Sequence, residues 1–178
     1  MKKLIAIILA TIMMLGLVST AFAAVDLSGM TVEELNELKH QIEIELSKLN
    51  APTEAVIAGD LGTLHVAITK VVKGEDFEGN PAVTIEYYLT NNGNAPVSPI
   101  TSVYVTASQN GKDLENTVVI NPDDKTSMTT FEDIAPQTSK TLKSSYKLVD
   151  DSPVTVKASL LLDFTGAIPP LEATVDIK

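Results

Sequence analysis

The feature that most constrains the fold is an alternation of apolar and polar residues through most of the chain after residue 63. It is clearest over 64–69, 83–90, 103–107, 154–164 and 171–177, and weaker over 141–148, 118–120 and 128–131. Successive side chains of a β-strand point to opposite faces of a sheet, so a period of two predicts half-buried strands. We therefore expect seven or eight short strands.

Short turn-forming clusters separate these predicted strands. They lie at 78–81, 91–94, 110–111, 121–124 and 150–153 and are rich in Gly, Asn, Asp and Pro. Asn110-Gly111 is a favoured two-residue hairpin turn, and the Asn91-Asn92-Gly93 run supplies residues that tolerate positive φ. No helical pattern intervenes. The predicted fold class is therefore mainly β, an immunoglobulin-like antiparallel β-sandwich over residues 63–178.

An amphipathic helix is predicted ahead of the strands, within a lead and helix over residues 24–50. Thr31 and Glu34 have the spacing of a capping box, and Pro52 ends the helix. One face carries a stripe of apolar residues at three- and four-residue steps: Leu35, Leu38, Ile42, Leu46 and Leu49. The stripe must pack on its own domain, pair with a second copy of the chain, or dock a different partner. Residues 51–62, with Pro52, Gly59 and Gly62 among small residues, are interpreted as a linker.

The first 23 residues have the three parts of a secretory signal peptide. Lys2 and Lys3 precede an apolar run over 4–18, and Ala21-Phe22-Ala23 places small residues at the third and first positions before a cleavage point. We predict cleavage after Ala23. The apolar run is short and lacks a basic stop-transfer flank, so we expect no membrane span after cleavage.

Cysteine content and charge narrow the class of protein further. The chain has no cysteine, which excludes disulfides, thiolate metal sites and a cysteine-linked lipid anchor. Without Lys2 and Lys3 it carries 11 lysines, no arginine and 23 acidic side chains, a formal charge of −12. Nucleic acid binding needs clustered cations, so we expect no nucleic acid partner. The predicted location is secreted or extracellular, without lipid anchoring.

Several fragments resemble a bacterial extracellular family, the domain of unknown function numbered 5067. They are Gly74 to Val83, Tyr87 to Asn92, Ser108 to Gly111 with Leu114, Ile134 to Pro136, Tyr146 to Leu148, and Pro153-Val154. The resemblance covers roughly residues 62–177. It implies an immunoglobulin-like module of secreted and cell-surface proteins in Gram-positive bacteria, and it supplies no catalytic residues. Members often carry an anchoring cysteine, which this chain lacks.

Catalytic constellations are missing from the sequence. His40 and His65 are the only histidines; His40 falls in the predicted helix and His65 on the face of a predicted strand opposite its apolar residues. We find no nucleophile elbow, zinc-protease motif or phosphate-binding glycine loop. Glycosidase clefts are usually lined by aromatic platforms, whereas this chain has no tryptophan. We expect no enzyme activity and no cofactor.

Two sets of residues remain as candidate ligand sites. Acidic pairs in predicted turns, Asp123-Asp124 and Asp150-Asp151, offer oxygen ligands for calcium, although Asp is also an ordinary turn residue. Tyr88 and Tyr104 fall on the faces of their strands opposite the predicted core. There they either form an exposed pair that grips a peptide or sugar, or pair across strands to steady the sheet.

The favoured function is a secreted, non-catalytic binding module for an extracellular or cell-surface protein or glycan. An alternative is a structural protein that forms homo-oligomers through the N-terminal helix. An extracellular hydrolase is a more remote alternative.

Overall fold

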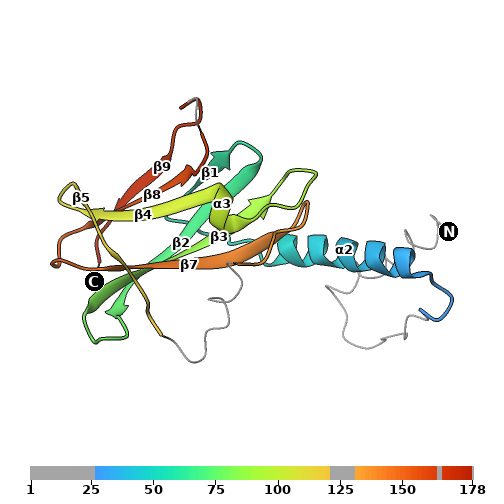
Figure 1. Cartoon of the computed structure of the whole chain (residues 1–178), viewed down its shortest axis with the longest axis horizontal. Coiled ribbons are helices and arrows are strands. Elements are labelled where there is room, and N and C mark those ends of the chain that lie inside the picture. The colour runs from blue at the N-terminus through green and yellow to red at the C-terminus, as the bar shows by residue number, and fades with distance from the viewer. Residues whose placement is uncertain (1–26, 121–130, 164–165, 178) are drawn as a thin grey trace. The chain divides into compact units, whose positions relative to one another are not determined.

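The computed structural model describes residues 27–120, 131–163 and 166–177 (Figure 1). The chain divides into two units, residues 1–45 and 46–178. Helix α2 (Val32–Leu49) begins in the first unit and ends in the second. The second unit contains all the strands described here.

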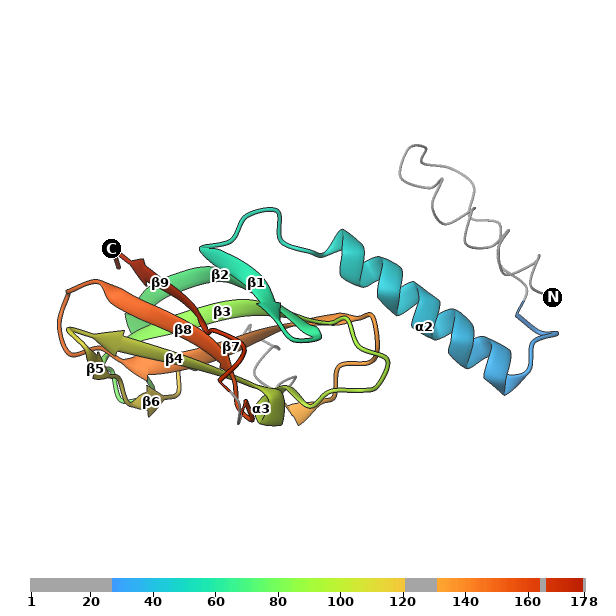
Figure 2. The same cartoon turned by 90° about the horizontal axis from the view of Figure 1, so that it is seen from above.

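The strands form two antiparallel sheets packed as a sandwich, which confirms the predicted fold class (Figure 2). The first sheet has five strands in the order β1 (Ile57–Leu61), β2 (Leu64–Glu75), β3 (Pro81–Asn91), β7 (Ser139–Lys147) and β6 (Asn116–Thr117). The second sheet has four, in the order β5 (Lys112–Asp113), β4 (Val103–Gln109), β8 (Val154–Leu160) and β9 (Leu171–Val175). Strands β5 and β6 have only two residues each, and β1 and β5 lie where the alternation predicts no strand.

The core lies between the two sheets and is built from the alternating residues. Its fully buried members include Val66, Ile68, Val83, Ile85 and Leu89 from the first sheet and Val154, Val156 and Ala158 from the second. Burial of apolar surface of this kind provides most of the folding free energy of a domain. The alternation of each strand therefore sets which face it turns inward.

One buried hydroxyl joins the two sheets through the core. The Tyr146 hydroxyl, on β7, donates to the carbonyl oxygen of Val105, on β4. Tyr146 is only 2% exposed. Burial raises the pKa of this phenol, and the nearby Tyr104 and Tyr87 add to the effect, so Tyr146 stays a neutral donor.

The predicted linker over 51–62 is wrong in its second half, because β1 lies there. Strand β1 pairs with β2 in an antiparallel hairpin whose turn contains Gly62 at φ 66°. A two-residue hairpin turn needs positive φ at its first position, and glycine adopts it without strain. At Gly59, an added Cβ would lie 2.6 Å from the Leu171 side chain, so this glycine lets Leu171 of β9 pack closely on β1.

Other local predictions differ in outcome. The capping box is confirmed, since Thr31 Oγ1 accepts from the Glu34 amide at 3.3 Å and Glu34 Oε2 accepts from the Thr31 amide at 3.0 Å. Asn110-Gly111 forms its hairpin turn with φ values of 52° and 76°. The strand expected at 118–120 is absent, and the pairing occurs instead at β6. Most of the strand expected at 128–131 lies outside the described residues, and Phe131 is in no strand.

We predict that Tyr146→Phe lowers the free energy of unfolding by about 1–3 kcal/mol, because it leaves the buried Val105 carbonyl without its donor. Urea denaturation measures this change. Tyr104→Phe is the matched control, since Tyr104 is 48% exposed. An equal loss in both variants would show that the bond between the sheets contributes nothing specific.

Candidate functional site

A small apolar hollow opens at one end of the sandwich, where β2 and β4 begin and β8 ends. Its volume is about 380 Å³, and it is lined by Leu61, Gly62, Thr63, Leu64, Val97, Thr101, Ser102, Leu160 and Leu162. None of these side chains is charged. Among the described lining residues, Thr63, Thr101 and Ser102 provide the only polar side chains.

Three connections between strands build this hollow. The β1–β2 turn supplies Gly62 and Thr63. Helix α3 (Pro99–Ser102) begins with proline, whose missing N–H is tolerated in a first helical turn, and supplies two hydroxyl residues. The chain after β8 is fixed against α3, because the Leu161 amide donates to the Ser102 carbonyl oxygen at 3.0 Å.

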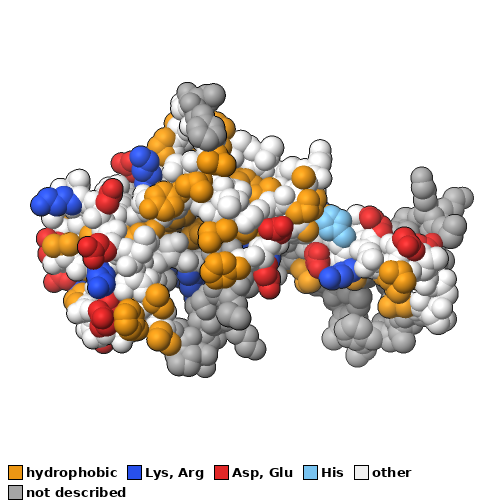
Figure 3. Space-filling model, viewed as in Figure 1, with side chains coloured by type: hydrophobic (Ala, Val, Ile, Leu, Met, Phe, Trp, Pro, Cys, Tyr) orange, Lys and Arg blue, Asp and Glu red, His pale blue; other side chains and the backbone are white. Residues whose placement is uncertain are grey.

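Apolar side chains in the segments that line the hollow are exposed to solvent. Leu162 is 63% exposed, Ile100 50% and Leu161 46%. Figure 3 shows hydrophobic side chains gathered on the face that carries β4 and α3. Grouped apolar side chains at a surface are typical of interaction sites.

The sequence prediction missed this site, although one signal was present. Alternation predicts a strand through residue 164, but β8 ends at Leu160. The period of two is broken by three consecutive leucines, Leu160-Leu161-Leu162. Adjacent side chains of a strand point to opposite faces of the sheet, so two neighbouring leucines cannot both face the core. Helix α3 carries no comparable signal, because four residues are too few for a helical period.

The predicted pair of exposed tyrosines does not form. Tyr88 lies on β3 in the first sheet and Tyr104 on β4 in the second, so they also cannot pair across neighbouring strands. Tyr104 is 48% exposed, whereas Tyr88 is only 7% exposed. The prediction that Tyr88 is exposed is therefore wrong. Its side chain lies under the end of the helix, where its hydroxyl donates to the Ser47 carbonyl oxygen at 2.5 Å.

Ser47 fixes the C-terminal end of α2 to the outer face of the first sheet. Its carbonyl oxygen accepts from Tyr88 on β3, and its Oγ accepts from the Ser139 amide on β7 at 2.9 Å. The last turn of the helix therefore belongs to the sandwich. The stripe of α2 is unevenly exposed: Leu38 is buried, Leu35 is half-buried, and Ile42, Leu46 and Leu49 are exposed.

The acidic turn at Asp150-Asp151 is engaged in contacts within the protein. Asp150 Oδ1 accepts from the Ser152 amide at 2.9 Å, and Asp151 Oδ1 contacts Lys73 Nζ. Hydrogen bonds from the Ser152 hydroxyl and amide lower the pKa of Asp150, with a smaller contribution from Asn110. Asp123 and Asp124 lie outside the described residues. In the described ranges, no three His, Cys, Asp or Glu side chains gather as a metal site would require.

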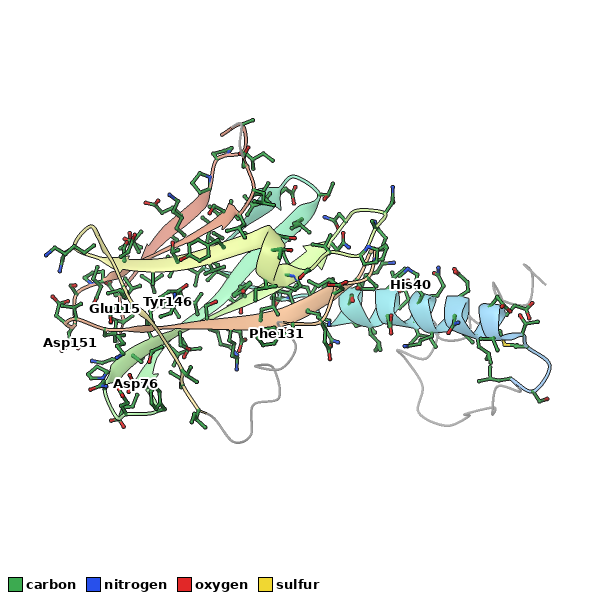
Figure 4. The ribbon with its side chains drawn as sticks, viewed as in Figure 1. His40, Asp76, Glu115, Phe131, Tyr146 and Asp151 are labelled. Carbon is green, nitrogen blue, oxygen red and sulfur yellow. The ribbon has the colours of Figure 1, made fainter. Side chains whose placement is uncertain are left out.

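Asp76 organises the β2–β3 turn, a role that the sequence did not reveal (Figure 4). Its Oδ1 accepts from the Asn80 amide at 2.8 Å and the Glu78 amide at 3.0 Å, and its Oδ2 accepts from Thr117 Oγ1 at 3.0 Å. Burial raises the pKa of Asp76, but these hydrogen bonds together with the Asn80 side chain outweigh it, so the pKa lies below its ordinary value.

The side-chain amides of two further buried residues, Asn91 and Gln109, also hold turns, here by donating to backbone carbonyl oxygens. Asn91 is fully buried, and its Nδ2 donates to the carbonyl oxygens of Ala95 at 2.8 Å and Ile134 at 3.0 Å. The Asn91-Asn92-Gly93 turn therefore forms without the positive φ values that its residues tolerate. Gln109 Nε2 donates to the Asp150 carbonyl at 3.1 Å and to the Ser152 carbonyl at 2.8 Å.

The two histidines lie apart from these clusters. His65, on β2, is partly exposed, and its Nδ1 is 2.7 Å from Oδ1 of Asp60, its cross-strand neighbour on β1. His40 lies on α2 and is half-buried.

The chain belongs to the family described as domain of unknown function (DUF5067), whose model matches residues 33–159. This confirms the resemblance but moves its bounds from the expected 62–177. The match begins inside α2, so the helix belongs to the family region, and β9 lies outside it. A search of curated protein sequences finds no significant match.

Solved structures show the same fold at low sequence identity. The YcdA protein of Bacillus subtilis, described as a "putative lipoprotein", matches with a TM-score of 0.54 and 11% identity over 69% of this chain. The match spans only 39% of that longer chain. The YjhA protein of Bacillus subtilis matches with a TM-score of 0.50 and 12% identity, covering 70% of this chain and 98% of its own.

We predict that Asp76→Asn lowers the melting temperature at pH 7 because it removes the charged acceptor of the β2–β3 turn. The pKa of Asp76 is lower in the folded state than its unfolded value of about 3.9. The charged carboxylate therefore stabilises the fold at pH values above the unfolded pKa, and this stabilisation is lost as the pH falls through the folded-state pKa. The gap between wild type and variant should therefore close in acid. Calorimetry from pH 7 to pH 2 measures it. The exposed neighbour Glu75, changed to Gln, is the control, and a gap independent of pH would contradict the prediction.

We also predict that Ser47→Ala speeds hydrogen exchange of the Ser139 amide and lowers the free energy of unfolding by about 0.5–1.5 kcal/mol, because this amide loses its acceptor. Exchange measured by NMR and urea denaturation test both effects. Leu49→Ala is the control, since Leu49 is 80% exposed. Unchanged exchange at Ser139 would contradict the anchoring role of Ser47.

Proposed function

We propose that this protein is an exported, non-catalytic binding module that recognises an extracellular protein through the apolar hollow at the end of its sandwich. The observation that carries the proposal is the uncharged hollow of about 380 Å³ bordered by exposed leucine and isoleucine side chains. A hollow of this size and chemistry accepts an apolar side chain of a partner, which is the usual way in which interface anchors bind.

The composition of the lining favours a protein ligand over a glycan. Among the described residues, no aromatic side chain lines the hollow. Sugar-binding clefts commonly stack sugar rings on aromatic faces and bind their hydroxyls with charged or amide groups, and the lining offers neither. A glycan ligand is therefore an outcome for the experiment to detect.

Export is supported by the N-terminal sequence. The basic end, the apolar run and the small residues before Ala24 match a signal peptide. Within the described part of the chain, no helix combines the length and apolarity needed to cross a membrane.

A role without catalysis is supported by what the polar groups contact. Asp76 and Asp150, whose pKa values are lowered, hold backbone amides of their own turns. Perturbed carboxyls in active sites usually face a cleft, whereas these two face the protein itself.

Photo-crosslinking from the rim of the hollow tests the proposed function. A benzoylphenylalanine placed at Leu162 in the chain 24–178 should capture a protein from the surface of producing cells or from host extracellular material. The same group at Val72, which is 53% exposed on the first sheet, is the matched control. The captured adduct should be degraded by protease and reduced by Thr101→Lys, which adds a charge to the lining.

Each other result counts against the proposal. Equal capture from both positions would show that the hollow has no special role. Adducts that resist protease but yield to glycan-degrading enzymes would make the ligand a carbohydrate. Turnover of glycan or peptide substrates by the purified chain would favour a hydrolase instead.

A further inference from the structure

The residues of the apolar stripe of α2 have the same spacing in both directions along the helix. Its members are separated by three, four, four and three residues, so the pattern is symmetric about Ile42. Packing on a single domain does not require such symmetry. A pair of identical helices related by a two-fold axis does, because each position must face the symmetry-related surface of the other copy.

An antiparallel pair centred on Ile42 brings the whole stripe into register. Ile42 meets Ile42 of the second copy, Leu35 lies level with Leu49, and Leu38 lies level with Leu46. At 1.5 Å per residue the stripe is about 21 Å long, which makes a short but continuous apolar seam. A shift by one residue in either direction breaks all of these matches.

The charges at the ends of α2 favour the same orientation. Glu33 and Glu34 lie in its first turn and Lys48 in its last. An antiparallel pair sets the acidic first turn of one helix beside the basic last turn of the other, and it also opposes the two helix dipoles. A parallel pair would set the four first-turn carboxylates together.

The exposed part of the stripe gives the pair its contact surface. Ile42 is 40% exposed, Leu46 51% and Leu49 80% in the full-length chain. Three apolar residues on one helical face remain in water unless a partner covers them. We make the inference for the chain that begins at Ala24, after the predicted cleavage.

We propose that α2 is a homodimerisation element in which two copies of the mature chain pair their helices antiparallel, about a two-fold axis at Ile42. The partner is a second copy of this chain. Such a dimer presents two sandwich domains, so a ligand with repeated sites would bind with increased avidity. The seam is shorter than a standard protein interface, and we expect the dimer to dissociate on dilution.

Disulfide trapping of the chain 24–178 tests the orientation, because a chain without native cysteine gives unambiguous cross-links. Ile42→Cys should form a disulfide dimer with itself. Leu35→Cys and Leu49→Cys should each fail to cross-link alone but should cross-link when mixed. If each of these two variants cross-links with itself, the pair is parallel and the proposal is wrong.

Light scattering across a dilution series tests the dimer itself. Wild type should have twice the monomer mass when concentrated, and Ile42→Lys should have the monomer mass throughout. Ile44→Lys is the matched control, since Ile44 lies two residues away on the opposite face of the helix and should leave the dimer intact. Far-ultraviolet circular dichroism checks that both variants keep their fold.

Two outcomes would overturn the proposal by showing another occupant of the stripe. A wild-type monomer at every concentration, with no cross-link at Ile42, would mean that the helix packs on its own chain or on a different protein. A dimer lost in Ile44→Lys but kept in Ile42→Lys would place the interface on the opposite face.

Discussion

The two sheets are held in one arrangement by a shared apolar core and by the Tyr146 hydroxyl, which crosses that core to the Val105 carbonyl. Apolar burial drives the sheets together but does not choose how they are aligned, because it has no direction. A buried hydrogen bond is directional, and breaking it leaves a polar group without a partner in a dry interior. The position of β4 against β7, and with it the start of β4 beside α3, depends on this contact.

Buried polar side chains give the turns a fixed shape in the same way. Asp76, Asn91 and Gln109 each bind backbone groups of a turn, and among the described residues no buried side-chain nitrogen or oxygen lacks a partner. Most of the polar groups that resemble functional sites in the sequence are therefore used for structure. Exposed apolar side chains lie at Leu162 beside the hollow and at Ile42, Leu46 and Leu49 on α2.

The main strands were predictable because each keeps its own alternation, and α2 because its capping box and stripe are local. The first half of α2 could therefore be predicted from the local sequence that begins at Thr31. Tyr88 was misplaced because its burial comes from Ser47, far away in the sequence. Likewise β1 was taken for part of a linker, and the close contact of its Gly59 with Leu171 is one that no local pattern records.

The sequence by itself determined the fold class, the capping box, the Asn110-Gly111 turn and the symmetric spacing of the helical stripe, since each depends on neighbours within a few residues. Only the tertiary structure decided which aromatic side chains are exposed, which acidic groups are engaged in turns, and where the hollow forms. The hollow joins residues from three connections, with its lining running from Leu61 to Leu162 along the chain. Contacts of that kind arise when the two sheets pack, so a period along the chain cannot encode them.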